Sequence, residues 1–465
     1  MGGCALAAAR VVLAALAALG ALLSPSTESA SAGVPLLPPI PRDWPAWFAL
    51  GLDNEIDRAD LLAATGAPWD FRYQYLSGGV DTGRGWTTWR SPAGTFARDY
   101  LRESQARGYR SLFVYYLLRD SGSGASTDEQ TAMLTNLRNP VLMQTYYADF
   151  SLLLDQIAAF SDPVWIIVEP DLWGYAQNTV VGRTNDGRDV PAAVRATGLP
   201  LLADLPDTLA GFASALVRLR DQRAPNARLL FHVNTWSTGA DAALETWEGR
   251  WAPDIATKTA DFLRTINVRP GSGWDALSLD IANASAGYYE VVKGEDRWWD
   301  RTNRKRPHFE FFFSYLQALI QTTGFRVALW QIPLGNQVYR TLNNTPGHYQ
   351  DNKAEILFAN LDRLNAAGVI ALLFGDPLAD DTSYWDKRRD GITNPEPIVA
   401  RDCNRCNTKV AIYPDDDGGY LREQALAYYR NRLLLPPGLR YRLLIPLLPL
   451  APVPSHPAQG MPPHP

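Results

Sequence analysis

The feature that most constrains the fold of this chain is an alternation of apolar, β-rich runs with helix-period segments. Eight such runs end in polar or aromatic residues, at 47–54, 71–79, 111–120, 164–171, 228–236, 276–285, 326–336 and 369–377. Helix-period segments lie between most of them, at 94–109, 145–160, 205–222, 254–266, 309–323 and 354–368. Strands that alternate with helices favour a parallel sheet, and eight of them favour closure. We therefore predict a (β/α)8 barrel of the TIM type, regular or distorted, as a single catalytic-type domain.

Two classes of partner are disfavoured by the sequence. No Gly-x-Gly-x-x-Gly motif follows the first run, so the nucleotide-binding form of this alternation has no support. The chain has a net charge of -5, and its acidic and basic residues are interspersed without a basic stripe. Nucleic acid is therefore not an expected partner. We expect the protein to be a monomer.

Residues 1–32 are typical of a secretory signal. Arg10 precedes an apolar run at 11–23, and Ala30-Ser31-Ala32 offers a small-residue cleavage site before Gly33. The apolar run is shorter than the roughly 20 residues that span a bilayer. We expect a secreted protein whose mature chain has no membrane span, and retention of this segment as an anchor is the alternative.

The rest of the chain divides into three parts. Residues 33–46 form a Pro-rich lead-in, and residues 47–435 form the barrel domain with a long loop at 378–418 and a closing helix at 419–435. Residues 436–465 form a Pro-rich tail, which is too interrupted by proline to cross a membrane as a helix.

The mature chain has two cysteines, Cys403 and Cys406. In an oxidising compartment, we interpret them as a local disulfide. A zinc site would need two further ligands, and the five histidines do not cluster near the pair. Since the barrel also offers no histidine pair at ligand spacing, we expect neither a catalytic metal nor a cofactor.

Acid, amide and aromatic residues gather where the predicted strands end, which is the face of a β/α barrel that carries its active site. The candidates for catalysis are the carboxylates of Asp120, Glu169, Asp171, Asp280 and Asp376. The candidates for substrate contact are Tyr75, Tyr116, Arg119, Trp173, Asn234, Trp236, Trp330 and Gln331. Lysine is absent from the strand ends, which argues against Schiff-base chemistry.

Carboxylates, amides and indoles together suit a sugar chain. Cleavage of a glycosidic bond needs one protonated carboxyl group near the leaving oxygen and a second, ionised carboxylate. Close carboxylates raise each other's proton affinity, which keeps the acid protonated. We therefore predict a glycoside hydrolase that acts on a polysaccharide. The alternative is a catalytically inactive, glycan-binding barrel. A hydrolase of other substrates is disfavoured because no Gly-x-Ser-x-Gly motif is present.

Several of these carboxylates also have a structural interpretation. Asp53 and Asp376 precede polar loop residues and could cap helices or form turns. Glu169 could pair with an arginine such as Arg119 as part of the scaffold. For Asp280, which lies within an apolar run, a hydrogen bond to a neighbouring strand and a place in the site remain equally open.

Two segments resemble glycoside hydrolase family 6. The segment FVYYLLRDSGSG (113–124) is similar to the strand-three segment of that family, and WIIVEPDLWGYAQN (165–178) is similar to its strand-four segment. The resemblance implies that Asp120 is the general acid and that Asp171 assists it by raising its pKa and stabilising positive charge. It also implies a secreted, metal-independent, inverting β-1,4-glucanase. The segment DIANAS (280–285) echoes an Asn-x-Ala-Asn strand of the family.

The chain departs from the family pattern at several positions. The link from Tyr115 to Arg119 is one residue shorter than usual, and Ser121 stands where the family often has cysteine. The segment HVNTW (232–236) replaces an Asp-Ala-Gly-His strand, and Asp376 is only a positional substitute for a late loop aspartate. The family barrel usually has seven strands, whereas this chain has eight candidate runs.

A second template, the large clan of retaining barrel glycosidases, fits less well. Its acid is a glutamate after strand four that asparagine usually precedes, whereas Val168 precedes Glu169 here. Its nucleophile is a glutamate after strand seven, where this chain has Trp330-Gln331. We therefore expect inversion, with either Asp280 or Asp376 positioning the water.

Overall fold

The computed structural model describes residues 37–122, 128–281, 285–376, 378–401 and 407–438. The predicted signal at 1–32, the pair Cys403 and Cys406, and most of the Pro-rich tail lie outside the described residues. Among the described residues, no helix is both long enough and apolar enough to cross a bilayer.

Eight parallel strands close into a barrel in the order of the sequence, as predicted. The strands are β1 (Ala49–Asp53), β2 (Phe71–Leu76), β3 (Arg110–Tyr115), β4 (Val164–Val168), β5 (Ala227–Val233), β6 (Ala276–Asp280), β7 (Val327–Ile332) and β8 (Val369–Phe374). Each predicted run overlaps one of them, and β3 and β5 begin one residue before their runs. The ladder is regular except between β7 and β8, where the register shifts twice. The (β/α)8 prediction is therefore confirmed.

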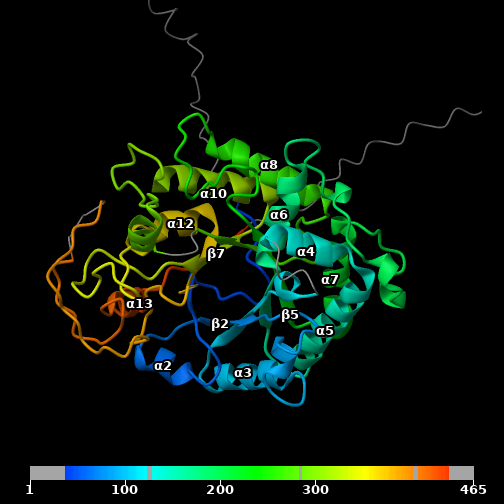
Figure 1. Ribbon diagram of the computed structural model, residues 1–465, viewed down its shortest axis with the longest axis horizontal. Coiled ribbons are helices and arrows are strands. Elements are labelled where there is room, and N and C mark those ends of the chain that lie inside the picture. The colour runs from blue at the N-terminus through cyan, green and yellow to red at the C-terminus, as the bar shows by residue number, and fades with distance from the viewer. Residues whose placement is uncertain (1–36, 123–127, 282–284, 377, 402–406, 439–465) are drawn as a thin grey trace, which may run out of the picture. The chain divides into compact units, whose positions relative to one another are not determined.

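Helices surround the barrel and cover its outer face (Figure 1), and side chains of the strands fill its interior. The helices are α2 (Ala59–Ala64), α3 (Thr95–Ala106), α4 (Glu129–Arg138), α5 (Pro140–Ala158), α6 (Pro170–Val180), α7 (Leu209–Arg223), α8 (Ala252–Thr265), α9 (Ala286–Tyr288), α10 (Phe309–Thr323), α11 (Lys353–Ala359), α12 (Leu361–Ala367) and α13 (Tyr420–Tyr429). All five residues of β4 are buried, which explains why its sequence is continuously apolar rather than alternating.

The segment after β4 is the helix α6, which includes a glycine, Gly174. Pro170 occupies the first turn of α6, where the missing N–H of proline costs no hydrogen bond. The helix then continues through Gly174. A Cβ at Gly174 would lie 2.6 Å from Oδ1 of Asn234 and 2.7 Å from a ring carbon of Trp236. Gly174 therefore lets α6 approach the end of β5 closely and does not end the helix.

Two long connections pack against each other beside the barrel. Residues 333–352 link β7 to α11, and residues 378–418 lie between β8 and α13; we call them the double loop. The Nε of Arg340 donates to the carbonyl of Pro395 at 2.6 Å, and the amide of Gln350 donates to the carbonyl of Ile398 at 3.3 Å. In Figure 1 the yellow and orange traces beside α13 belong to this region.

Asp70 ties together the amino-terminal end of the barrel. This residue precedes β2 and is almost fully buried. Its carboxylate accepts hydrogen bonds from Nε1 of Trp47 at 2.7 Å, the backbone N–H of Leu50 at 3.1 Å and the hydroxyl of Tyr429 at 3.0 Å. It therefore connects β1, β2 and the closing helix α13.

Replacing Asp70 with alanine should lower the free energy of unfolding by about 3 kcal/mol, because three donors lose a buried acceptor. Urea denaturation followed by circular dichroism measures the loss. Asp60→Ala, at an exposed position of α2, is the control and should change stability by no more than about 0.5 kcal/mol. Equal stability of the two variants would contradict this role of Asp70.

Candidate active site at the carboxyl ends of the strands

An aromatic floor, formed by Tyr73, Tyr75 and Trp330, lies at the carboxyl ends of β2 and β7. The ring centroids of Tyr75 and Trp330 are 5.9 Å apart, and those of Tyr73 and Trp330 are 6.3 Å apart. Gln331 donates a hydrogen bond to the hydroxyl of Tyr75. Among the described residues, the buried Nε1 of Trp330 has no hydrogen-bond partner, so it remains available to a ligand or a water.

Asp171 lies beside this floor in the first turn of α6. The hydroxyl of Tyr116 donates to its Oδ2 at 2.8 Å, and the amide of Asn234 lies 3.4 Å from its Oδ1. Burial, together with the charges of Asp280 and Glu129, raises the pKa of Asp171 to about 6, against the opposing effect of the hydrogen bond from Tyr116. Asp171 is therefore a carboxyl group that holds a proton in mildly acidic solution.

Asp280, the last residue of β6, forms a pair with His232 of β5. The Nε2 of His232 lies 3.3 Å from Oδ1 of Asp280, and its Nδ1 lies 3.0 Å from the hydroxyl of Ser278. Both members of the pair are buried. The structural and the catalytic interpretation of Asp280 thus both have a basis: it bonds a side chain of the neighbouring strand, and its charge acts on Asp171.

A second pair of acids lies where β8 meets β1. Burial raises the pKa of Asp53 well above its ordinary value, and the charge of Asp376 raises it further. Burial also raises the pKa of Asp376, although the ammonium group of Lys387 lies 2.7 Å from its Oδ2 and opposes the shift. These residues line a cavity of about 350 Å³. The cavity is also lined by Asn54, Glu55, Arg58, Tyr384, Trp385 and Arg389.

Tyr75 connects the two groups of acids. Burial raises the pKa of its hydroxyl, and the charges of Asp53, Asp171 and Asp280 contribute to the increase. The tyrosine therefore lies within electrostatic reach of both groups. Four of the strand-end carboxylates surround the aromatic floor, and three of them, Asp171, Asp280 and Asp376, were candidates from the sequence.

Glu169 does not line the site at the carboxyl ends of the strands. Its side chain is completely buried, and its Oε1 accepts hydrogen bonds from the backbone N–H groups of Leu117 at 2.9 Å and Leu118 at 3.1 Å. Burial raises its pKa to about 8. Glu169 therefore braces the turn after β3. These contacts support the structural interpretation of Glu169, with the backbone of the turn as its partner in place of Arg119, whose guanidinium faces Glu129 at 3.8 Å.

Trp173 is likewise not a sugar platform. Only 2 % of its surface is exposed, its Nε1 donates to the carbonyl of Val168 at 2.8 Å, and its ring centroid lies 4.5 Å from that of Phe231. The indole belongs to the layer between the barrel and the outer helices. The reason is helical geometry: Trp173 lies two residues after Asp171 on α6, so the two side chains point in different directions.

Trp236 remains available as a platform. It is half-buried, and its ring centroid lies 4.9 Å from that of Tyr175. The neighbouring Asn234 is buried, and its Oδ1 has no hydrogen-bond partner among the described residues. The partly exposed indole of Trp236 thus offers an aromatic face that suits a sugar ring.

The segment after β3 holds Tyr116, Arg119 and Asp120. Asp120 ends a short 3-10 turn, η2 (Leu118–Asp120), and is half-buried, whereas Arg119 is exposed. Glu129, the first residue of α4, lies within hydrogen-bond distance of the Tyr116 hydroxyl that also faces Asp171, so the two carboxyl groups share one O–H; Glu129 was missed in the sequence. Its only signal is the pair Asp128-Glu129, which is typical of any helix start.

Comparisons with known proteins describe the fold alone. No family model matches the chain, and no curated protein matches it. Solved structures do match. An exo-beta-1,4-mannosidase from an Opitutaceae bacterium is 13% identical, covers 83% of this chain and 60% of its own, and has a TM-score of 0.41. The protein GH5_18 from Streptomyces cattleya, solved with GlcNAc, is 14% identical, covers 82% and 76%, and has a TM-score of 0.39.

A cellobiohydrolase II from Humicola insolens, solved with glucose and cellotetraose, is 16% identical over 61% of this chain and 67% of its own, with a TM-score of 0.30. A citrate synthase and an aldolase match as well. At these identities the likeness concerns the β/α barrel, and the chemistry of the site has to be inferred from its residues.

The pKa of Asp171 has a consequence for stability. Its folded-state pKa of about 6 lies above the ordinary 3.8, so the stability that it contributes is present below pH 3.8 and is lost as the pH rises through 6. Between pH 4 and pH 7 the wild-type protein should therefore lose more stability than Asp171→Asn, by up to about 3 kcal/mol. Urea unfolding at both pH values measures this. Asp254→Asn, at an exposed position of α8, should lose as much stability between the two pH values as the wild type does. The same loss in Asp171→Asn would contradict the raised pKa of Asp171.

Proposed function

We propose that this protein is an exported glycoside hydrolase that cleaves a polysaccharide. The observation that carries the proposal is the set of carboxylates around the aromatic floor, with Asp171 and Asp280 on one side and Asp53 and Asp376 on the other. Glycosidic cleavage needs one carboxyl group that is protonated and one that is ionised. Asp171 meets the first requirement in mildly acidic solution, and Asp280, which is paired with His232, is the candidate for the second.

The role of proton donor has two candidates. The family resemblance assigns it to Asp120, with Asp171 as the group that supports it. The raised pKa of Asp171 and its hydrogen bonds from Tyr116 and Asn234 support a more direct part in proton transfer. The two assignments differ in which substitution abolishes proton donation, so kinetics can separate them.

The water-activating base also has two candidates, Asp280 and Asp376. Asp280 is held by the imidazole of His232, and Asp376 is held by the ammonium group of Lys387. Each partner favours the ionised carboxylate that a base must be. An inverting enzyme separates its acid and its base by roughly 6.5 to 9.5 Å to leave room for the water.

A catalytically inactive, glycan-binding barrel is the second candidate function. It is favoured by one observation: Lys387 already neutralises Asp376, as it would in a site that only binds. Such a protein would keep the aromatic surfaces at Tyr75 and Trp236 but would not need a protonated carboxyl group.

Loss of the proton donor should abolish cleavage of natural polymers while sparing activated substrates. Asp120→Asn and Asp171→Asn should be compared for reducing-sugar release from β-glucans, mannans and xylans. The variant that lacks the acid should lose 10²- to 10⁴-fold in rate. The same variant should retain activity on dinitrophenyl glycosides, because their leaving group needs no proton.

Asp254→Asn is the matched control and should behave as the wild type on both substrate classes. If the wild type releases no sugar from any polymer but binds one of them, and the binding survives in both aspartate variants, the hydrolase proposal fails and the glycan-binding barrel replaces it.

Trp236→Ala should weaken binding of the cognate polymer about tenfold, equivalent to about 1.4 kcal/mol, because the variant loses a large apolar face next to Asn234. Affinity electrophoresis in gels that contain the polymer measures the change. Tyr109→Ala, at the opposite end of the barrel before β3, is the control. If the polymer in the gel retarded both variants equally, Trp236 would not be part of the binding surface.

A further inference from the structure

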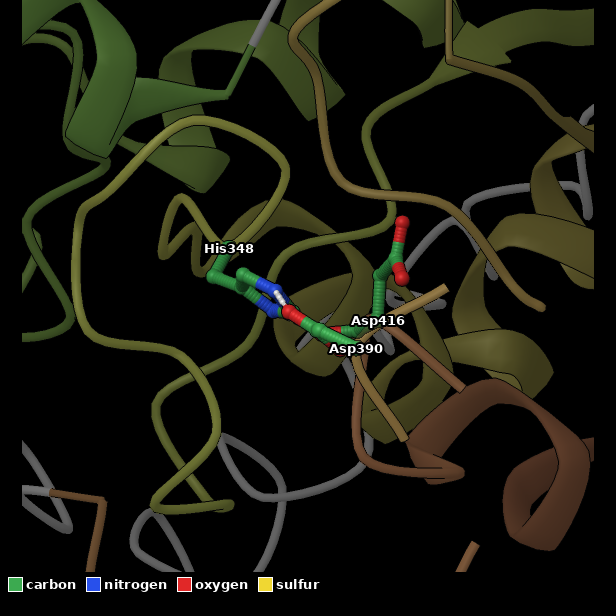
Figure 2. A group of neighbouring side chains, drawn as sticks. All are labelled: His348, Asp390 and Asp416. Carbon is green, nitrogen blue, oxygen red and sulfur yellow. Dashed lines mark hydrogen bonds and ion pairs between the residues drawn. The ribbon is translucent and has the colours of Figure 1, made fainter. Parts of the chain in front are cut away.

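A cluster of potential metal ligands joins the two halves of the double loop. His348 lies on the 333–352 segment, and Asp390 and Asp416 lie on the 378–418 segment. One ligand atom from each of the three lies within 4.8 Å of the others. Figure 2 shows the imidazole of His348 turned toward the carboxylate of Asp390, whereas the carboxylate of Asp416 lies to one side and has to turn toward the pair to bind the same ion. None of the three belongs to the site at the strand ends.

In neutral His348, the unprotonated ring nitrogen faces a carboxylate oxygen of Asp390, so that two hydrogen-bond acceptors lie next to each other. The Nδ1 of His348 lies 3.1 Å from the backbone carbonyl oxygen of Asp416, which can only accept, so Nδ1 carries the hydrogen. In the neutral ring, Nε2 then presents its lone pair to Oδ2 of Asp390, which lies 2.9 Å away. A lone pair and a carboxylate repel each other unless a proton or a metal ion lies between them. A ring N–H on a carbonyl with the other nitrogen free is also how metal-binding histidines are oriented.

The spacing of the pair suits a shared ion. Metal–nitrogen and metal–oxygen bonds of about 2.0 to 2.2 Å place neighbouring ligand atoms about 3 Å apart in octahedral coordination and about 3.4 Å apart in tetrahedral coordination. The 2.9 Å between Nε2 of His348 and Oδ2 of Asp390 matches the octahedral separation. These two atoms can therefore bind one ion without a change of rotamer.

Asp416 provides an independent observation. Its side chain is fully buried, and neither carboxylate oxygen has a hydrogen-bond partner of ordinary geometry among the described residues. A buried carboxylate in this position is costly unless it is neutralised, and a bound cation neutralises it.

We propose that His348, Asp390 and Asp416 bind one divalent transition-metal ion, with Zn²⁺ as the ion that best fits the ligands. The ion is held by Nε2 of His348 and by one carboxylate oxygen from each aspartate. Imidazole and carboxylate donors suit Zn²⁺ and Mn²⁺, whereas Ca²⁺ takes oxygen ligands. Three protein ligands leave the remaining coordination positions to water.

The ion has a structural consequence at the mouth of the barrel. The backbone N–H of Asp416 donates to the carbonyl of Trp385 at 3.3 Å, and that of Asp417 donates to the carbonyl of Ser383 at 3.1 Å. Between them, the hydroxyl of Tyr384 accepts a hydrogen bond from Asn54 at 2.7 Å. Residues 383–385 therefore connect the metal ligands to the cavity at Asp53 and Asp376, and metal binding fixes one wall of that cavity.

The test is metal binding by the full chain after treatment with a chelator. Because Cys403, Cys406 and the tail histidines His456 and His464 can also bind zinc, the reference protein carries Cys403→Ser, Cys406→Ser, His456→Gln and His464→Gln. In this background, competition with a chromophoric chelator should detect one Zn²⁺ site that Asp416→Asn weakens at least tenfold. ZnCl2 should raise the melting temperature of the reference protein but not that of Asp416→Asn.

Asp386→Asn is the matched control. The carboxylate of Asp386 accepts the backbone N–H groups of Asp390 at 3.0 Å and Gly391 at 3.3 Å, so it is a neighbour of the ligands and not one of them. This variant should keep the zinc affinity of the reference. His348→Gln is the second test variant if Asp416→Asn does not fold by circular dichroism.

Equal zinc affinity in the reference and in both ligand variants would overturn the proposal, as would the absence of any site in the reference. The cluster would then be a plain ion pair between His348 and Asp390. Either result leaves the hydrolase proposal intact, because its own test uses sugar release.

Discussion

The pairing of β1 with β8 is the interaction on which the rest of the structure depends. Four residue pairs, from Ala49 with Ala371 to Leu52 with Phe374, complete the ladder and leave the sheet without an edge. Closure also brings the ends of the first and last strands together, so Asp53 and Asp376 share one cavity although almost the whole domain separates them in sequence. The same closure places Tyr75 of β2 within reach of acids on both sides of the mouth.

Two of the strand ends are conformationally strained. Glu169 after β4 has a φ of 45°, and Gln331 near the end of β7 has a φ of 50°, in the left-handed region that residues other than glycine rarely adopt. Each is held in place by its side chain: Glu169 bonds the turn after β3, and Gln331 bonds the hydroxyl of Tyr75. The strained residue Glu169 lies two residues before Asp171, and the strained residue Gln331 contacts the aromatic floor. Both strained positions therefore adjoin residues of the candidate site.

The barrel could be predicted because its signal is periodic and local. The strands are apolar on both faces, and α10 occupies the predicted range 309–323. The site was predicted less completely, since burial of a single side chain depends on its tertiary neighbours. Trp173 and Trp236 look alike in the sequence, but helix geometry turns the first into the core and leaves the second at the surface. His348, Asp390 and Asp416 share no spacing at all, because two separate loops bring them together.

The partners of the acids distinguish a reactive site from one that only binds. Asp376 faces the ammonium group of Lys387, and Asp280 faces the imidazole of His232, so each has a group that can stabilise its negative charge. The hydrogen-bond partners of Asp171, the hydroxyl of Tyr116 and the amide of Asn234, are neutral. Buried beside other acids, Asp171 holds its proton more tightly than an ordinary aspartate. A binding surface gains nothing from such a group, because a neutral amide would make similar hydrogen bonds without the cost of burying a charge. An acid that must donate a proton and later recover it requires that property.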